Sequence, residues 1–224
     1  MTRDRVLVWD GCVNVRDLGG LPLEDGGETR FRVVVRADSI RGLTDTGWVA
    51  LREYGFGTVI DLRGDAEVAQ DPPAPVPVTR VPIEPPEDWP SMREAYLMQL
   101  SRSRATFTRA VDLIALSEGP AVVHCQGGRD RTGLLVALVL DAAGVPRETI
   151  AADHALSDEN FAPHNDAWFA EAATEEERQR RMRIAVPAGR TMIDVLDDVD
   201  RRWGGPAGYL GTNSLDTLVL RLRG

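Results

Sequence analysis

A ten-residue stretch of the chain carries the residue types needed for nucleophilic chemistry on an anion. Residues 124–133 read HCQGGRDRTG, with Cys125 six positions before Arg131. We expect a strand before this stretch and a helix after it, and a helix N-terminus offers unpaired N–H groups and a positive dipole end. Gly127 and Gly128 would let successive amides curl around a tetrahedral oxyanion. Arg131 could bind that anion bidentately, and the thiolate stabilised by the same charges would be placed for in-line attack.

The stretch resembles the HCx5R[ST]G signature of the cysteine-based protein tyrosine phosphatase superfamily. Its Asp-Arg pair at 130–131 makes it similar to the atypical bacterial tyrosine phosphatases, whose loop reads HCxxGKDRTG. Residues 14–20 (NVRDLGG) resemble the NxRDLGG block of that family. VVRADSIRGL at 34–43, together with IDLR at 60–63, is similar to its FRS…L…DLR blocks. The blocks occur in the family's order and span more than half of the chain.

The resemblance implies a role for each matching residue. Cys125 is the expected nucleophile, which forms a phosphocysteine intermediate. Arg131 would bind the phosphoryl oxygens and stabilise the transition state, and Thr132 would donate its hydroxyl to the departing thiolate. His124 resembles the family's buried histidine, which bonds within the loop. The implied substrate-binding residues are those of the loop itself: Gln126, Gly127, Gly128, Arg129, Asp130 and Arg131.

The leaving alcohol needs a proton, and two carboxyl groups are equal candidates for its source. Asp61 ends a predicted buried strand, and Asp130 lies inside the loop. Either could instead orient an arginine of the loop. Asp88 is a third and weaker candidate. The dipeptide at 89–90 (WP) is followed by Ser91, so it is not the WPD motif of the mammalian-type enzymes.

Several functions fit a cysteine on such a loop. The leading hypothesis is a metal-independent phosphomonoester hydrolase acting on phosphotyrosine in proteins. Arg129 stands where the family usually has lysine, and its charge could hold a second phosphate. The alternative is therefore a phosphoinositide or phosphoserine/threonine phosphatase. A non-catalytic phosphate-binding module is disfavoured because the nucleophile and the arginine are both present. A rhodanese-type loop would be shorter, and nothing in the chain implies a metal or an organic cofactor.

Charge and composition exclude other partners and sites. The 224 residues carry a net charge of −9, which disfavours broad nucleic-acid or membrane-surface binding. All 26 basic residues are arginine, so chemistry that needs a lysine is excluded. No signal peptide is evident and the longest apolar run, 134–140, is too short for stable membrane insertion. We expect a cytoplasmic protein; secretion without a signal and the oligomeric state stay open.

The alternation of strands and helices predicts an α/β fold in which helices flank one mainly parallel sheet. Strands are expected at 6–9, 31–35, 58–62, 78–83 and 121–124. Helices are expected at 44–54, 91–100, 104–116, 132–143, 147–155, 188–203 and 214–222. The proline-rich stretch 71–90 reads as an internal connection, so residues 1–224 are expected to form a single phosphatase domain.

The charged segment 158–183 is expected to be partly helical. Its simplest interpretation is a solvated helix face. The alternative is a helical lid over the active site, within residues 158–190.

Other polar residues have structural interpretations. Cys12 is expected to be a packed thiol, with a redox link to Cys125 as the alternative. His154 and His164 have no ligand partners at metal spacing. The residues expected to brace the catalytic loop are Asn14, Arg16 and Asp17.

Overall fold

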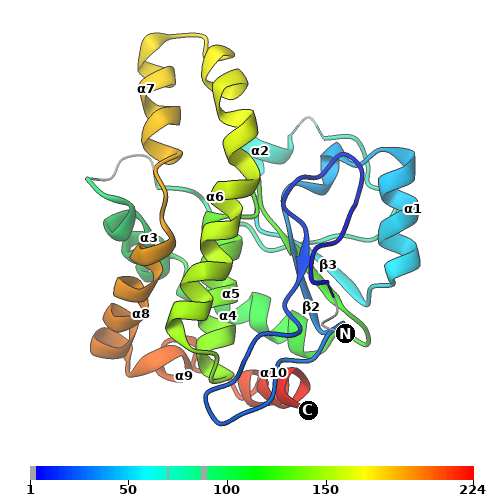
Figure 1. The fold of residues 1–224 in the computed structure, drawn as a ribbon, viewed down its shortest axis with the longest axis vertical. Coiled ribbons are helices and arrows are strands. Elements are labelled where there is room, and N and C mark those ends of the chain that lie inside the picture. The colour runs from blue at the N-terminus through cyan, green and yellow to red at the C-terminus, as the bar shows by residue number, and fades with distance from the viewer. Residues whose placement is uncertain (1–3, 70, 87–89) are drawn as a thin grey trace.

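A five-stranded sheet lies at the centre of the described part of the chain. The computed structural model describes residues 4–69, 71–86 and 90–224 (Figure 1). Across the sheet the strands follow the order β1-β2-β5-β3-β4. Their bounds are β1 Arg16–Asp17, β2 Val34–Ala37, β3 Thr58–Asp61, β4 Thr79–Arg80 and β5 Ala121–His124. Among these strands β1 alone runs antiparallel to its neighbour, so the expected mainly parallel sheet is confirmed.

The register of three parallel strands brings their carboxyl ends to one edge of the sheet. His124 of β5 pairs with Ala37 of β2 on one side and with Asp61 of β3 on the other. Ligands of such sheets bind beyond the carboxyl ends of the strands. The first residue after the central strand is Cys125, so the topology places this thiol in the middle of that edge.

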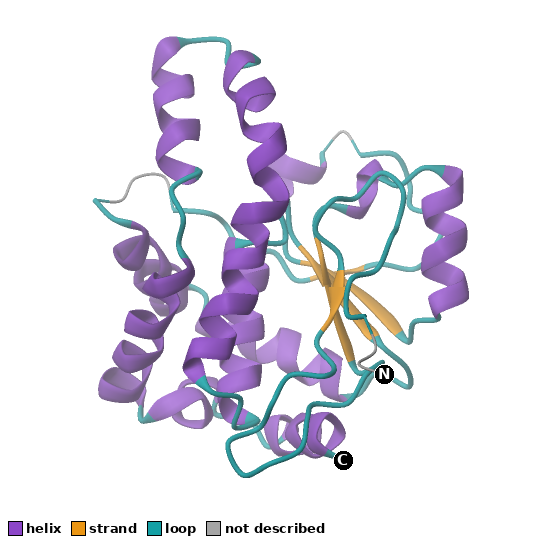
Figure 2. Ribbon diagram, viewed as in Figure 1, coloured by secondary structure: helices purple, strands orange, loops and turns teal. Residues whose placement is uncertain are grey.

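Helices cover the two faces of the sheet unequally (Figures 1 and 2). Successive strand residues point to opposite faces, and Val122 and Val123 of β5 accordingly belong to separate hydrophobic cores. α1 (Asp45–Tyr54) packs over the face of Val122. It begins where the side chain of Thr44 accepts a hydrogen bond from a backbone N–H of the first turn.

The opposite face carries the larger helical layer. Its members are α3 (Met92–Arg102), α4 (Arg104–Ala115), α5 (Asp130–Ala142), α8 (Gly189–Trp203), α9 (Gly205–Leu210) and α10 (Ser214–Arg223). α5 contacts all the other members of this layer, and every residue from Leu134 to Leu140 is buried. A helix enclosed on all sides is apolar all round, which explains the composition of this run. Within the described ranges, no helix has both the length and the hydrophobicity of a membrane span.

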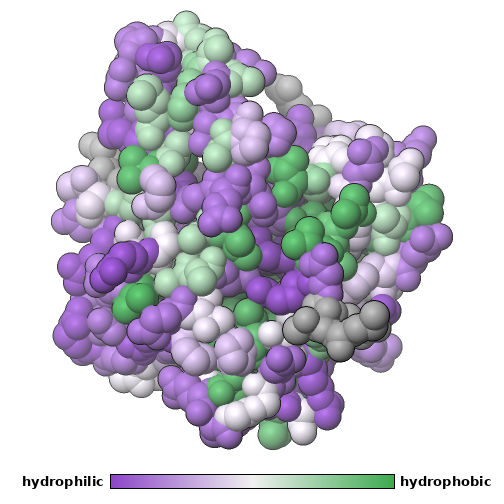
Figure 3. All heavy atoms as spheres, viewed as in Figure 1, coloured by the Kyte–Doolittle hydropathy of each residue, from purple (hydrophilic) through white to green (hydrophobic). Residues whose placement is uncertain are grey.

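α6 (Arg147–Ala170) and α7 (Glu175–Ile184) form a hairpin that projects beyond the sheet and its helices (Figure 1). The sequence predicted a helix over 147–155 and a partly helical segment over 158–183, whereas the structure has one continuous helix from 147 to 170. α6 continues through Pro163, which is exposed, so the carbonyl that proline leaves without an intrahelical partner can bind water. On the face shown in Figure 3, hydrophobic and hydrophilic residues are mixed over the projecting part.

Other local differences have simple causes. The strand expected at 6–9 is reduced to an isolated bridge between Val6 and Arg16. Of the strand expected at 78–83, only β4 is regular, although the N–H groups of Val81 and Ile83 still donate to the carbonyls of Asp61 and Leu62 at 2.9 and 3.0 Å. The short elements that the sequence pattern did not predict are β1, the 3-10 helix Ile40–Gly42, α2 (Asp65–Val68) and α9.

Candidate active site

Cys125 occupies the base of a loop between β5 and α5. Its side chain is buried, with 2% of the residue exposed. The loop covers residues 126–129, and α5 begins at Asp130, two residues before the predicted start. The unpaired N–H groups and the positive dipole end of α5 therefore meet the loop, which favours an anion there.

Donors from outside the loop bind its backbone carbonyls. The backbone N–H of Ser39 donates to the carbonyl of Gln126 at 3.0 Å. Asn14 Nδ2 donates to the carbonyl of Gly127 at 2.8 Å, and Arg36 Nη2 donates to the carbonyl of Gly128 at 2.7 Å. In a trans peptide the carbonyl and the following N–H point in opposite directions. The N–H groups of residues 127–129 therefore point into the loop, where an anion would meet several donors at once.

The two glycines of the loop differ in how much space a side chain would have. Gly128 has φ of +61°, and a Cβ there would lie 2.2 Å from the carbonyl oxygen of Ala37. Only glycine fits this position. At Gly127 a Cβ would lie 3.5 Å from the ring of Phe161 on α6, an ordinary contact. The base of the α6–α7 hairpin thus reaches the catalytic loop.

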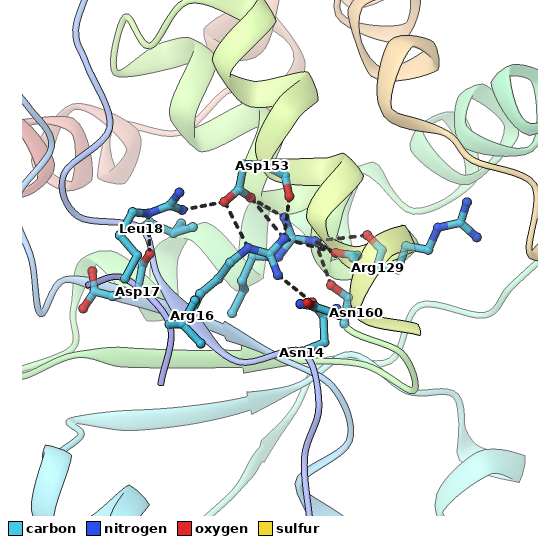
Figure 4. Close-up of polar contacts among 12 residues, drawn as sticks. Asn14, Arg16, Asp17, Leu18, Arg129, Asp153 and Asn160 are labelled. Atoms are coloured by element: carbon cyan, nitrogen blue, oxygen red, sulfur yellow. Dashed lines mark hydrogen bonds and ion pairs between the residues drawn. The ribbon is translucent and has the colours of Figure 1, made fainter. Parts of the chain in front are cut away.

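A buried ionic cluster ties the loop to α6 (Figure 4). Arg16 Nη1 donates to Asn14 Oδ1 at 2.6 Å, and its Nε donates to Asp153 Oδ1 at 3.0 Å. Arg36 Nη1 donates to the other oxygen of Asp153 at 2.6 Å. Asn14 and Arg16 brace the loop in this way. Asp17 instead accepts from the backbone N–H of Gly19 at 2.6 Å, and its other oxygen accepts from the N–H of Arg32 at 2.8 Å and from the hydroxyl of Tyr54.

The cluster places net positive charge beside the loop. It contains three guanidinium groups, those of Arg5, Arg16 and Arg36, around the carboxylate of Asp153. Burial alone would raise the pKa of Asp153, but the three arginines outweigh it and hold the pKa far below its usual range. Burial and repulsion from Arg36 lower the pKa of Arg16 to about 10. Asp153 and Arg16 are therefore charged at neutral pH, and three guanidinium groups around one carboxylate favour a bound anion.

Glu67 of α2 holds Arg131, a role that the sequence analysis missed. Its carboxylate accepts from both terminal nitrogens of Arg131, with Nη2 to Oε1 at 2.8 Å. Burial alone would raise the pKa of Glu67, but hydrogen bonds and the charge of Arg131 outweigh burial, so the pKa is lowered. The N–H of Gly64 also donates to Glu67, at 2.8 Å. A glutamate three residues after a helix start is half of a capping box, and this was the available signal.

Asp61 has both carboxylate oxygens bound. Arg63 donates from its backbone N–H to Oδ1 at 2.9 Å and from Nη2 to Oδ2 at 2.8 Å. Asp61 is buried, and Nδ1 of His124 lies 3.8 Å away. Burial raises the pKa of Asp61, yet the hydrogen bonds from Arg63 and nearby positive charge outweigh it and lower the pKa.

Asp130 is more open than Asp61. Its side chain is 33% exposed, and its Oδ1 accepts a hydrogen bond from the hydroxyl of Tyr96 at 2.6 Å. Arg129 Nε lies 3.9 Å from the same oxygen. In the part of the chain that is described, Oδ2 accepts no hydrogen bond from the protein. The third candidate, Asp88, lies outside the described residues, as does Trp89.

Arg129 binds the α6–α7 hairpin. Its Nε lies 2.6 Å from Asp158 Oδ1 of α6, and its two terminal nitrogens donate to the carbonyls of Ile184 and Val186 at the end of α7. Its side chain is 8% exposed. In Figure 4 this side chain points away from the Asp153 cluster.

Thr132, His124 and Cys12 are three further side chains that the sequence singled out. The hydroxyl of Thr132 is buried and has no hydrogen-bond partner within the described residues. Burial lowers the pKa of His124 to about 4, so its ring is neutral, and Nδ1 lies 3.4 Å from the carbonyl of Cys125. Burial, together with Asp38, raises the pKa of Cys12, so that thiol stays protonated.

Comparison with known proteins agrees with this geometry. The model of the tyrosine phosphatase family matches residues 7–223. A tyrosine-protein phosphatase of Nostoc commune is 34% identical over 139 residues, which cover 55% of this chain and 47% of that protein. The triple specificity protein phosphatase PtpB of Mycobacterium tuberculosis is 29% identical over 168 residues, which cover 56% of this chain and 60% of PtpB. The chain spans about half the length of the first relative and less than two thirds of the second.

A third relative aligns over most of both chains. This Cupriavidus necator protein, provisionally named a tyrosine-protein phosphatase, is 24% identical over 241 residues, covering 97% of this chain and 87% of its own. The family resemblance expected from the loop motif is confirmed.

Proposed function

Because the chain belongs to the tyrosine phosphatase family, we propose that it hydrolyses phosphomonoesters, with phosphotyrosine in proteins as its substrate class. The observation that carries the proposal is the loop above Cys125, whose amides point inward beside an arginine oriented by Glu67. Nothing in this chemistry requires a cofactor. We propose that residues 1–224 act as one domain, in the cytoplasm.

The reaction follows from these groups in two steps. The phosphoryl oxygens bind the loop amides and the N–H groups of Arg131 that Glu67 leaves available. The Cys125 thiolate attacks phosphorus, the S–P bond forms as the ester P–O bond breaks, and the leaving oxygen takes a proton from an acid. Water then attacks the phosphocysteine and returns a proton to that acid. As the S–P bond breaks, the Thr132 hydroxyl donates a hydrogen bond to the departing thiolate.

We assign the general acid to Asp130. An acid must carry a transferable proton and have room for the leaving group. Asp61 is buried, its pKa is lowered, and both of its oxygens are bound by Arg63, so we propose that it orients the strand end. Asp130 has one oxygen without a donor among the described residues and a partly exposed side chain, which supports the assignment.

The surroundings of the loop favour an aryl phosphate. Phe161 approaches Gly127 from α6, where its ring would pack against that of a bound phosphotyrosine. We propose that the α6–α7 hairpin acts as a lid beside this ring, with Arg129 as its attachment to the loop.

A wider range of phosphoesters is the second candidate. It is supported by the relative that is named a triple specificity protein phosphatase. A second phosphate, as in an inositide, would need a cation that is not already bound. Arg129 contacts Asp158 and two carbonyls, so we rank inositides below monophosphorylated proteins.

The test is steady-state hydrolysis of a small aryl phosphate without added metal, with the wild type and Cys125→Ser compared. We expect turnover by the wild type and its loss in the variant, which should still bind vanadate, a phosphate mimic. Cys12→Ser is the matched control, because it removes the other thiol and should keep full activity. Turnover that survives in Cys125→Ser would contradict the proposed nucleophile.

A further inference from the structure

We infer that Tyr96 and His154 form a hydrogen-bonded chain that positions the transferable proton of Asp130, an inference that rests on the proposed function. Three helices supply its members: Tyr96 comes from α3, Asp130 from α5 and His154 from α6. The Tyr96 hydroxyl oxygen lies 2.6 Å from Asp130 Oδ1 and 3.1 Å from His154 Nε2. Tyr96 and His154 are each 1% exposed, so water does not replace these contacts.

Charge states give the chain a direction. Burial and the charge of Arg36 lower the pKa of His154 to about 3, so its ring is neutral and carries one N–H. Burial and Asp130 raise the pKa of Tyr96, which keeps its proton. Oδ1 of Asp130 can accept a hydrogen bond in either charge state, so the Tyr96 O–H donates to it when the proton of His154 is on Nε2. The tyrosine oxygen then accepts from the Nε2–H of His154.

The opposite nitrogen of His154 agrees with this tautomer. Nδ1 is buried and has no hydrogen-bond partner among the described residues. It is therefore a bare acceptor in the proposed tautomer, and an N–H at this position would be a buried donor without an acceptor. Gly133 of α5 leaves room for the ring, because a Cβ at that position would lie 2.6 Å from Nδ1.

The direction of the chain decides which oxygen of Asp130 carries the acid proton. While Tyr96 donates to Oδ1, that oxygen acts as an acceptor and the proton must be on Oδ2. Oδ2 is the oxygen that no described protein group binds. In the first step the Oδ2–H bond breaks and the proton joins the leaving oxygen. The carboxylate that remains keeps the hydrogen bond from Tyr96, so Tyr96 acts as a positioning residue for the acid.

The test compares two leaving groups in Tyr96→Phe. Phosphotyrosine releases a basic phenolate that needs a proton, whereas dinitrophenyl phosphate releases a stable phenolate that does not. We expect kcat for phosphotyrosine to fall roughly 3- to 10-fold, as for loss of a single hydrogen bond, and kcat for dinitrophenyl phosphate to stay unchanged. The ratio of the two values does not depend on the fraction of folded enzyme.

Tyr209→Phe is the matched control. Tyr209 is also buried, and its hydroxyl donates to the carbonyl of Leu100 at 2.7 Å, outside the site. We expect the ratio of kcat for phosphotyrosine to kcat for dinitrophenyl phosphate to be the same in Tyr209→Phe as in the wild type. His154→Phe removes the donor at the far end of the chain and should change the ratio in the same direction as Tyr96→Phe, by a smaller factor.

A double-mutant cycle then tests whether Tyr96 acts through Asp130. Asp130→Asn should lower kcat for phosphotyrosine far more than kcat for dinitrophenyl phosphate, and adding Tyr96→Phe should cause no further selective loss. Equal losses for both substrates in Tyr96→Phe would overturn the inference alone. Equal losses in Asp130→Asn would overturn the assignment of the acid and the inference with it. The Cys125→Ser experiment separates both outcomes from a failure of the proposed reaction.

Discussion

At the level of single residues, each arginine around the site is held by more than one acceptor. Arg131 is held by both oxygens of Glu67, and Arg63 binds Asp61 and Asp71 at 2.8 and 2.6 Å. A guanidinium has five donors in one plane, so two bonds fix its orientation while others stay available. A chain without lysine can therefore place positive charge at defined points around a bound phosphate.

The contact between Glu67 and Arg131 leads to the first prediction. Glu67→Gln keeps the size of the side chain and removes the charge that orients Arg131. We expect kcat for a small aryl phosphate to fall about 10-fold, because charge-assisted hydrogen bonds of this kind contribute roughly 1.5–3 kcal/mol. Inorganic phosphate should still inhibit with equal or lower Ki, because a negative charge next to the site is removed.

The exposed Glu53 on α1 provides the control for this change. Glu53→Gln removes the same charge far from the loop and should leave both constants unchanged. If Glu67→Gln keeps the wild-type kcat, Glu67 does not orient Arg131 in the reaction.

At the level of elements, Arg129 of the catalytic loop joins the two helices of the α6–α7 hairpin. Arg129 is the common partner of Asp158 on α6 and of two carbonyls at the end of α7. A planar guanidinium can reach all three acceptors, whereas an ammonium is a compact charge on a flexible stem. Arginine stands at this position where the resembled loop motif HCxxGKDRTG has lysine, and it thus has a structural consequence.

We predict that Arg129→Lys loosens this hairpin. Hydrogen–deuterium exchange of the backbone in residues 171–188 should become about 10-fold faster, because roughly 1–2 kcal/mol of local stability is lost. Arg178→Lys is the control: Arg178 is exposed and contacts only Glu175 in its own helix, at 3.5 Å, among the described residues. Unchanged exchange in Arg129→Lys would show that the hairpin is held by other contacts.

The same elements show how far the sequence could predict the site. Cys125, Arg131 and the strand-loop-helix around them follow from local spacing, because one short segment contains all of them. Tyr96 and Asp158 have no such signal, since their helices meet the loop only through tertiary packing. α6 was predicted too short because its buried residues end at Ser157, so no apolar periodicity marks the rest of the helix.

At the level of the whole molecule, α6 connects the site to the fold through two adjacent buried residues. Asp153 binds arginines of the N-terminal strands, and His154 contacts Tyr96 of α3. His124 is likewise buried, at the end of the central strand. The geometry of the site and the stability of the fold therefore depend on the same ionisable groups.

The buried histidines predict how stability depends on pH. The pKa of His124 is lowered to about 4 and that of His154 to about 3, both mainly by burial. In the unfolded chain each has a pKa of about 6.5, so the unfolded state binds more protons and stability falls as the pH decreases below that value. Between about pH 7 and about pH 5 each histidine should lower the free energy of unfolding by roughly 2 kcal/mol.

Urea unfolding of the wild type and of His154→Gln at these two pH values tests this dependence. Raised pKa values of Asp38 and Asp158 act in the opposite direction, but they are common to both proteins, so the difference between the two slopes isolates His154. We expect the variant to lose roughly 2 kcal/mol of the pH dependence, whatever its absolute stability. His164→Gln, a change at an exposed position of the same helix, should keep the wild-type slope. A slope in His154→Gln equal to that of the wild type would mean that His154 takes up a proton in the folded state. Both ring nitrogens of His154 would then carry a proton, and the direction of the hydrogen bonds toward Asp130 would no longer follow from a single tautomer.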